Sequence, residues 1–140
     1  MKFWDSSAII PLCIKEPASD TVKPIITADP DIVVWWATGV ECTSALSGRS
    51  RKGTIGTRAA VQAKNILHTL SEEWSEVQPT ELARQRAERL LMVHPLRAAD
   101  AFQLASALIW AEESARGSEI VCLDQNLREA ATKEGFTVLP

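Results

Sequence analysis

Four carboxylates stand where the chain is expected to leave a strand or enter a helix, each beside an apolar run. They are Asp5, Glu41, Asp100 and Asp124. In an α/β protein the carboxyl ends of parallel strands meet at one edge of the sheet, where ligands bind. Carboxylates gathered there repel one another and raise one another's pKa unless a cation neutralises them. Because every candidate ligand is an oxygen, the pattern predicts a site for Mg²⁺ or Mn²⁺ rather than zinc.

Asp100 is the most informative of these residues. It interrupts an apolar segment from Ala98 to Ala105, which is expected to form a buried helix. A buried charge without a partner costs several kcal/mol or takes up a proton. Asp100 therefore needs a partner, and the pattern favours a metal ion. A buried ion pair with Arg97 or another arginine is the alternative.

The other three acids each have a simpler explanation when taken alone. Asp5 can cap the helix that follows it, and so can Asp124, although Asn126 competes for that second cap. Glu41, in the first turn of a helix, would complement the helix dipole. Ser7 is placed to hold either a metal-bound water or the Asp5 carboxylate itself. The ordered set of four acids is therefore more specific than any one member.

The elements that must position these residues alternate between short strands and helices. The expected strands are residues 2–4, 32–36, 74–77, 120–123 and 136–139. The expected helices are residues 6–15, 18–28, 38–51, 57–70, 80–92, 98–116 and 126–134, and Gly117 is expected to stop the sixth. Such alternation predicts an α/β fold with a mainly parallel sheet covered by helices on both sides, a three-layer α/β/α architecture.

Length and composition predict one globular domain over residues 1–140. The chain is 46% hydrophobic and 24% charged, which is ordinary for a protein with its own core. No apolar stretch approaches the roughly 20 residues that a membrane span requires. The three cysteines, Cys13, Cys42 and Cys122, are widely spaced and odd in number, so we expect buried thiols and a cytoplasmic location.

The charges are unevenly distributed along the chain. No acid occurs between Cys42 and Ser71, where five basic residues lie, while the net charge of the whole chain is −3. A basic arm beside an acidic metal site would hold a polyanion, and we predict that Arg49, Arg51 and Lys52 contact the backbone of that polyanion. Solvated helix faces explain the charges equally well, and charge alone does not decide between the two.

The motifs together resemble the PIN-domain ribonucleases, and most closely the VapC-type toxins of type II toxin–antitoxin modules. The resemblance covers essentially the whole chain. It is carried by Asp5-Ser6-Ser7, by Glu41 with Ser44-Ala45-Leu46, by the segment from His94 to Ala105, by the segment from Cys122 to Ala131, and by Glu134-Gly135-Phe136. It implies a PIN-like fold, in which the four acids bind Mg²⁺ or Mn²⁺ and Ser7 is the small hydroxyl residue that supports the first of them. One departure is Cys122, where the family usually has Thr or Ser, and a thiol is a poorer hydrogen-bond partner.

The resemblance also implies an activity and partners. It implies a metal-dependent endoribonuclease that hydrolyses RNA to 3′-hydroxyl and 5′-phosphate ends, forms a homodimer and is inhibited by a cognate VapB-type antitoxin. A PIN-fold protein that has lost catalysis and serves as an RNA-binding or regulatory module is the main alternative. An aspartate-dependent phosphatase is a third hypothesis, but its chemistry usually requires a second Asp at position 7, where this chain has Ser.

Overall fold

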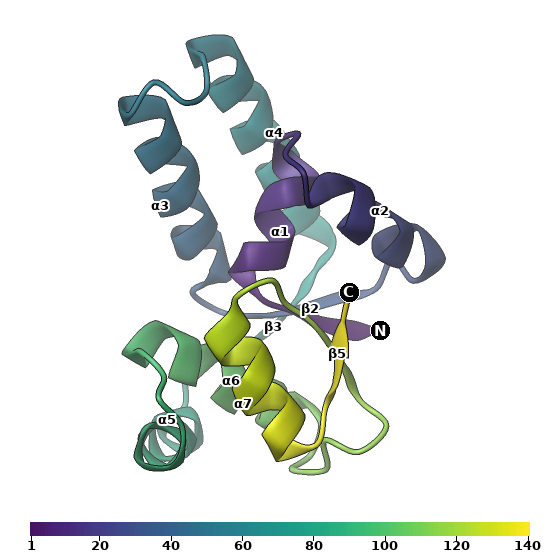
Figure 1. The fold of residues 1–140 in the computed structure, drawn as a ribbon, viewed down its shortest axis with the longest axis vertical. Coiled ribbons are helices and arrows are strands. Elements are labelled where there is room, and N and C mark those ends of the chain that lie inside the picture. The colour runs from purple at the N-terminus through teal and green to yellow at the C-terminus, as the bar shows by residue number, and fades with distance from the viewer.

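The computed structural model describes all residues, 1–140, and contains seven helices and five strands (Figure 1). The strands are β1 (Lys2–Trp4), β2 (Ile32–Trp35), β3 (Ser75–Val77), β4 (Glu119–Val121) and β5 (Thr137–Leu139). The helices are α1 (Ser6–Cys13), α2 (Ser19–Ala28), α3 (Thr38–Arg51), α4 (Thr57–Glu73), α5 (Glu81–Val93), α6 (Ala98–Trp110) and α7 (Gln125–Glu134). Every expected element is present, with ends that differ by a few residues.

The five strands form one sheet in the order β3-β2-β1-β4-β5, and every neighbouring pair is parallel. The sheet is thus wholly parallel, where the sequence predicted a mainly parallel one. The first strand lies at its centre, with Phe3 paired to Val33 on one side and to Ile120 on the other. Because neighbouring strands point the same way, their carboxyl ends, which precede Asp5 and Asp124, reach the same edge.

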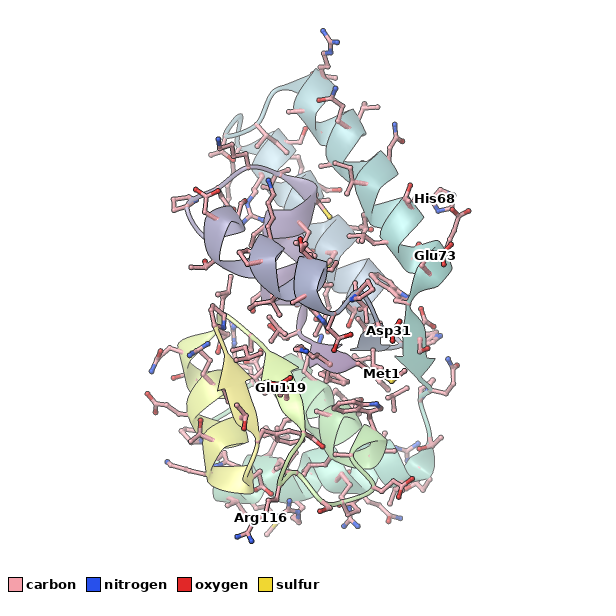
Figure 2. All side chains as sticks on the ribbon, turned by 90° about the vertical axis from the view of Figure 1, so that its right-hand side faces the viewer. Met1, Asp31, His68, Glu73, Arg116 and Glu119 are labelled. Carbon is pink, nitrogen blue, oxygen red and sulfur yellow. The ribbon has the colours of Figure 1, made fainter.

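Helices cover both faces of the sheet, which confirms the three-layer α/β/α architecture (Figures 1 and 2). Successive strand residues point to opposite faces, so Phe3 belongs to one buried cluster and Trp4 to the other. The Phe3 cluster is completed by apolar side chains from α5, α6 and α7. The Trp4 cluster is completed by side chains from α1, α2, α3 and α4. Strand β2 is buried along its whole length, as expected for a strand between two helical layers.

Helix α6 is shorter than predicted, because it ends at Trp110 rather than near Arg116. After Trp110 the amide of Glu113 bonds to the carbonyl of Leu108, and the amide of Glu112 bonds to that of Ile109. These two bonds form a Schellman-type stop in which Glu112 adopts a left-handed φ of 51°. The stop was not predicted because the left-handed position is occupied by glutamate rather than glycine. Arg116 lies in the loop beyond it, at the outer edge of the molecule (Figure 2).

Helices α3 and α4 lie side by side and extend well beyond the sheet (Figure 1). Helix α3 contributes Cys42 and Leu46 to the Trp4 cluster, and α4 contributes Leu67. The far ends of the two helices meet at the loop around Gly53 (Figure 1). Arg51 is the last residue of α3, so it lies at the outer end of this pair. No helix in the chain has both the length and the apolar character needed to cross a membrane.

Candidate active site

The four carboxylates line one cleft of about 320 Å³ at the carboxyl ends of β1 and β4. They arrive there from separate elements. Asp5 follows β1 directly, Asp124 lies in the β4–α7 connection, Glu41 is in the first turn of α3, and Asp100 is in the first turn of α6. The cleft therefore lies where the helices of the two layers meet over the edge of the sheet. The structure brings together all four acids that were expected to share a site.

Asp5 is the most deeply placed of the four, with only 3% of its surface exposed. Its Oδ2 accepts a hydrogen bond from the Ser7 amide at 2.9 Å and another from the Ser7 hydroxyl. Burial, together with the nearby charges of Glu41 and Asp100, raises the pKa of Asp5 to about 6, although the two bonds from Ser7 act to lower it. Asp5 thus experiences an excess of negative charge that a bound cation would neutralise.

Ser7 joins the two strand ends that carry Asp5 and Asp124. Its hydroxyl donates to Asp5 and accepts from the Leu123 amide at 2.9 Å. Of the two roles considered for Ser7, the structure thus has the one in which it holds the carboxylate. Asp124 in turn caps α7, because its Oδ1 accepts from the Leu127 amide at 2.9 Å. Asn126, the competing candidate for this cap, was therefore not the residue that caps the helix.

Glu41 and Asp100 are held by side chains rather than by backbone amides. The buried amide of Gln103 donates to Glu41 Oε2 at 2.7 Å. Arg97 Nε approaches Asp100 Oδ2 at 3.4 Å, but 84% of the Arg97 side chain is exposed. The proposed buried ion pair is therefore a loose pair at the surface. A pair of this kind contributes little to stability, and it leaves Asp100 free to bind another cation.

The donor set fits a hard divalent cation. Each carboxylate uses one oxygen in the hydrogen bonds above and has a second that accepts none: Asp5 Oδ1, Glu41 Oε1, Asp100 Oδ1 and Asp124 Oδ2. No three acidic, histidine or cysteine side chains lie close enough together to hold one ion directly. Mg²⁺ usually binds proteins through one or two carboxylates and keeps several waters. Four carboxylates that line one cleft without converging on a single point, each with an oxygen that accepts no hydrogen bond, suit that mode of binding.

Cys122 lies beside Asp5, at the end of β4. Its Sγ is 3.7 Å from Asp5 Oδ2 and 3.8 Å from the Ser7 hydroxyl, and burial raises the pKa of its thiol. The thiol therefore approaches Asp5 only through a long, weak contact, and Ser7 provides the strong hydroxyl bond. All three cysteines are buried free thiols, as predicted.

The cleft also contains a fifth acid, Glu16, to which the sequence gave no role there. The sequence marked Glu16 only as the residue before Pro17, where a helix was expected to end. In the structure its Oε2 lies 3.1 Å from the Arg49 guanidinium group. Arg49 is thus the only one of the three predicted RNA contacts that reaches the cleft. Arg51 lines a shallow hollow along α3, and Lys52 is exposed just beyond the helix end. The charges of Glu16 and Arg49 can be read from the sequence, but their ion pair cannot, because it depends on how α1 packs against α3.

The two histidines lie outside the cleft, as expected. His94 is buried and its Nε2 is 2.7 Å from Glu134 Oε1, so it joins the end of α5 to the end of α7. His68 is exposed on the outer face of α4 (Figure 2). A larger groove of about 710 Å³ between α1 and α4 is lined mainly by apolar side chains and contains no acid. Of these two hollows, only the smaller one is lined by carboxylates.

The all-parallel sheet, its strand order and the acidic cleft at the strand ends define a PIN-like α/β fold. Among solved structures the chain is similar to the VapC20 toxin of Mycobacterium tuberculosis, a sarcin–ricin loop cleaving toxin, with 22% identity, a TM-score of 0.68 and full coverage of both chains. It is similar to VapBC2 of Rickettsia felis bound to a promoter DNA fragment, with 9% identity, a TM-score of 0.70, and coverage of 99% of this chain and 98% of that one. A toxin–antitoxin complex from Klebsiella pneumoniae matches with 16% identity, a TM-score of 0.63, and coverage of 90% and 89%.

These likenesses establish the fold, and they confirm the PIN-like architecture that the motifs predicted. Neither the models of protein families nor the curated proteins yield a match to the sequence. An activity can therefore be inferred only from the residues of the cleft.

Proposed function

We propose that this protein is a VapC-type toxin, a metal-dependent endoribonuclease that hydrolyses RNA phosphodiester bonds. One observation carries the proposal: four carboxylates from distant parts of the chain line one cleft, and each has an oxygen without a hydrogen-bond partner. A buried, charged group with nothing to neutralise it is costly. In a fold shared with toxin–antitoxin proteins, that cost is best explained by a cation that binds during function.

Asp5, Glu41, Asp100 and Asp124 are the proposed ligands of Mg²⁺ or Mn²⁺. When bound, the ion polarises the scissile phosphate and makes the attacking water more acidic. The chain's own groups then have two tasks. The carboxylates would hold the ion in the cleft, directly or through water, and one of them would accept the proton of the attacking water. Ser7 keeps Asp5 in place through the hydrogen bonds described above.

Arg49 is the basic residue best placed to hold the RNA. It lies in the cleft beside the acids, and substrate would have to compete with Glu16 for its guanidinium group. Arg51 and Lys52 continue the positive charge toward the outer end of α3. We propose that a single-stranded segment follows this side of α3, since unpaired loops are the usual targets of sequence-selective RNA recognition.

A VapB-type antitoxin is the proposed inhibitor, and a homodimer in the cytoplasm the proposed working form. Toxin–antitoxin complexes are among the structures with this fold. A basic side chain from such a partner would neutralise the acidic cleft and occupy the position of the cation. Inhibition by this route requires no change in the fold of the toxin.

A PIN-fold RNA-binding module without catalysis is the second candidate. The observation in its favour is that no three of the acidic side chains share a position from which they could hold one ion directly. The two candidates differ in whether metal and Asp100 are needed for RNA cleavage, and a single experiment separates them.

That experiment is cleavage of total cellular RNA by the purified protein, free of antitoxin, with Mg²⁺ or Mn²⁺ and with EDTA. Asp100→Asn is the matched control, because it removes one charge with little change in shape. Discrete fragments that require both the metal and Asp100 are the expected result. RNA that stays intact with a folded protein, while the protein still binds it, would favour the binding module.

A further inference from the structure

Gln103 occupies an unusual place for an amide side chain. It is 1% exposed, in the middle of the mostly apolar helix α6. Helix α6 belongs to the layer that packs on Phe3, whereas the buried side chains of α3 pack in the layer around Trp4. The Gln103 amide hydrogen-bonds to α3, so it connects the two layers directly over the edge of the sheet.

Both protons of this amide are used on α3. Nε2 donates to Glu41 Oε2 at 2.7 Å and to Thr38 Oγ1 at 3.2 Å. Thr38 and Glu41 are three residues apart, so they lie on the same face of α3. Asp100 and Gln103 are also three residues apart and share one face of α6. The same face of α6 therefore provides one acid of the cleft and the donor that holds another.

The carbonyl oxygen of Gln103 has no such use. Its Oε1 is buried and has no hydrogen-bond partner. Leaving a buried acceptor unpaired is destabilising, and an apolar residue of similar size would avoid the penalty. Rotating the amide would not help, since it would place the carbonyl oxygen against the Glu41 carboxylate. The fold alone therefore does not explain a glutamine at this position, whereas the donor it offers to Glu41 does.

We propose that Gln103 is a positioning residue that fixes the Glu41 carboxylate for cation binding. Glu41 is only partly buried and has three rotatable side-chain bonds, so it would otherwise sample several orientations. The bond to Oε2 removes that freedom and leaves Oε1 available to the cleft. This inference rests on the metal site in the proposed function, and it assigns to Gln103 a part in that site that acts through Glu41.

The test is the affinity of the purified, metal-stripped protein for Mn²⁺, measured by titration calorimetry. Gln103→Met keeps the length and shape of the side chain and removes the donor. We expect it to weaken Mn²⁺ binding by about 10-fold, the lower end of what loss of a group that orients a ligand usually costs. Thr38→Val is the matched control, because it removes the other acceptor of the same amide and leaves Glu41 its donor. Its Mn²⁺ affinity should stay within about 2-fold of the wild type.

A double-mutant cycle identifies the route of the effect. In a Glu41→Ala background, Gln103→Met should cause no further loss of Mn²⁺ affinity, because the residue through which it acts is gone. Equal losses with and without Glu41, or equal losses in Gln103→Met and Thr38→Val, would overturn the inference and indicate a general structural role. Gln103→Leu replaces Gln103→Met if the melting temperature shows that the latter does not fold.

The two proposals fail in different ways. A wild-type protein that binds no Mn²⁺ would overturn the proposed function and this inference together. A wild-type protein that binds Mn²⁺, with a folded Gln103→Met variant of equal affinity, would overturn the inference alone.

Discussion

The two halves of the cleft are built by different means. The strand half consists of Asp5 and Asp124, which follow neighbouring parallel strands and accept hydrogen bonds from backbone amides. The helix half consists of Glu41 and Asp100, which accept hydrogen bonds only from side chains, namely Gln103 and the exposed Arg97. A backbone amide is placed by the fold itself, whereas a side-chain donor can be changed by one substitution. The carboxylates of the strand half are thus positioned by the fold, whereas the positions of those in the helix half can be altered by substituting one neighbouring side chain.

The largest effect is expected from breaking the strand half. Asp5→Asn and Asp124→Asn each remove a charge and keep the side-chain oxygen that accepts the local hydrogen bond. We expect RNA cleavage to fall by a factor on the order of 10² to 10³ in each, through loss of electrostatic stabilisation at the reacting phosphate. Single-turnover cleavage rates in Mn²⁺ measure this. Wild-type rates in either variant would remove that residue from the site.

The burial of Asp5 predicts a pH dependence of stability for the metal-free protein. Its pKa rises from 3.8 to about 6 on folding, so between these values the folded state binds a proton more tightly than the unfolded state. The free energy of unfolding therefore falls as pH rises through this window, by up to ~3 kcal/mol from this group.

Chemical denaturation in EDTA, at pH values from about 4 to 7, measures the effect as the difference between wild type and Asp5→Asn. Other groups, such as Glu134, whose pKa is lowered by its bonds to His94 and Arg89, contribute equally to both proteins and cancel. A constant difference across the range would contradict the assigned burial of Asp5.

Ser7 tests the link between the two strand ends. Ser7→Ala removes the hydroxyl that donates to Asp5 and leaves the partly buried Leu123 amide without its acceptor. We expect a loss of about 1–3 kcal/mol in stability, together with weaker Mn²⁺ binding. Ser6→Ala is the control, since Ser6 also lines the cleft but its hydroxyl makes no hydrogen bond within the protein. Equal stabilities in the two variants would argue against the bridging role.

The basic residues at the end of α3 and just beyond it test whether RNA binds on the side of the cleft that the helix half forms. Replacing Arg49, Arg51 and Lys52 by glutamine should weaken RNA binding and reduce the slope of log affinity against log salt by about 2. Because only Arg49 reaches the cleft, it alone should also affect the cleavage rate. Filter binding over a range of salt concentrations measures the slope, and an unchanged slope would exclude these residues as phosphate contacts.

The smallest effect is expected for Arg97, the exposed partner of Asp100. Arg97→Gln should change stability by no more than about 0.5 kcal/mol, because the Arg97 side chain is mostly in solvent. Thermal unfolding of the metal-free variant measures this. A loss of 2 kcal/mol or more would mean that Asp100 relies on Arg97, and that the helix half is as firmly fixed as the strand half.

The sequence predicted all four acids of the cleft, but it did not predict the contact that holds Glu41 in the helix half. Parallel strands place their carboxyl ends together, so the positions of Asp5 and Asp124 followed from the order of elements alone. The role of Gln103 could not be predicted, since its partner lies on a helix in the other layer. Helix ends show the same limit. Gly135 correctly predicted the end of α7, with φ 105°, whereas Glu112 ends α6 in a conformation that glycine usually marks.

The position of β1 at the centre of the sheet has a consequence for how the protein is made. A ribosome synthesises β1 before the other four strands, and Phe3 can pair with Ile120 only after β4 has been made. Contacts this distant in the chain form slowly and expose unpaired edges meanwhile. Asp100 and Asp124 also emerge late, so an incomplete chain has only half of the four acids. The cleft is therefore assembled late in folding, and a chain whose synthesis has not reached Asp124 does not contain all four of its acids.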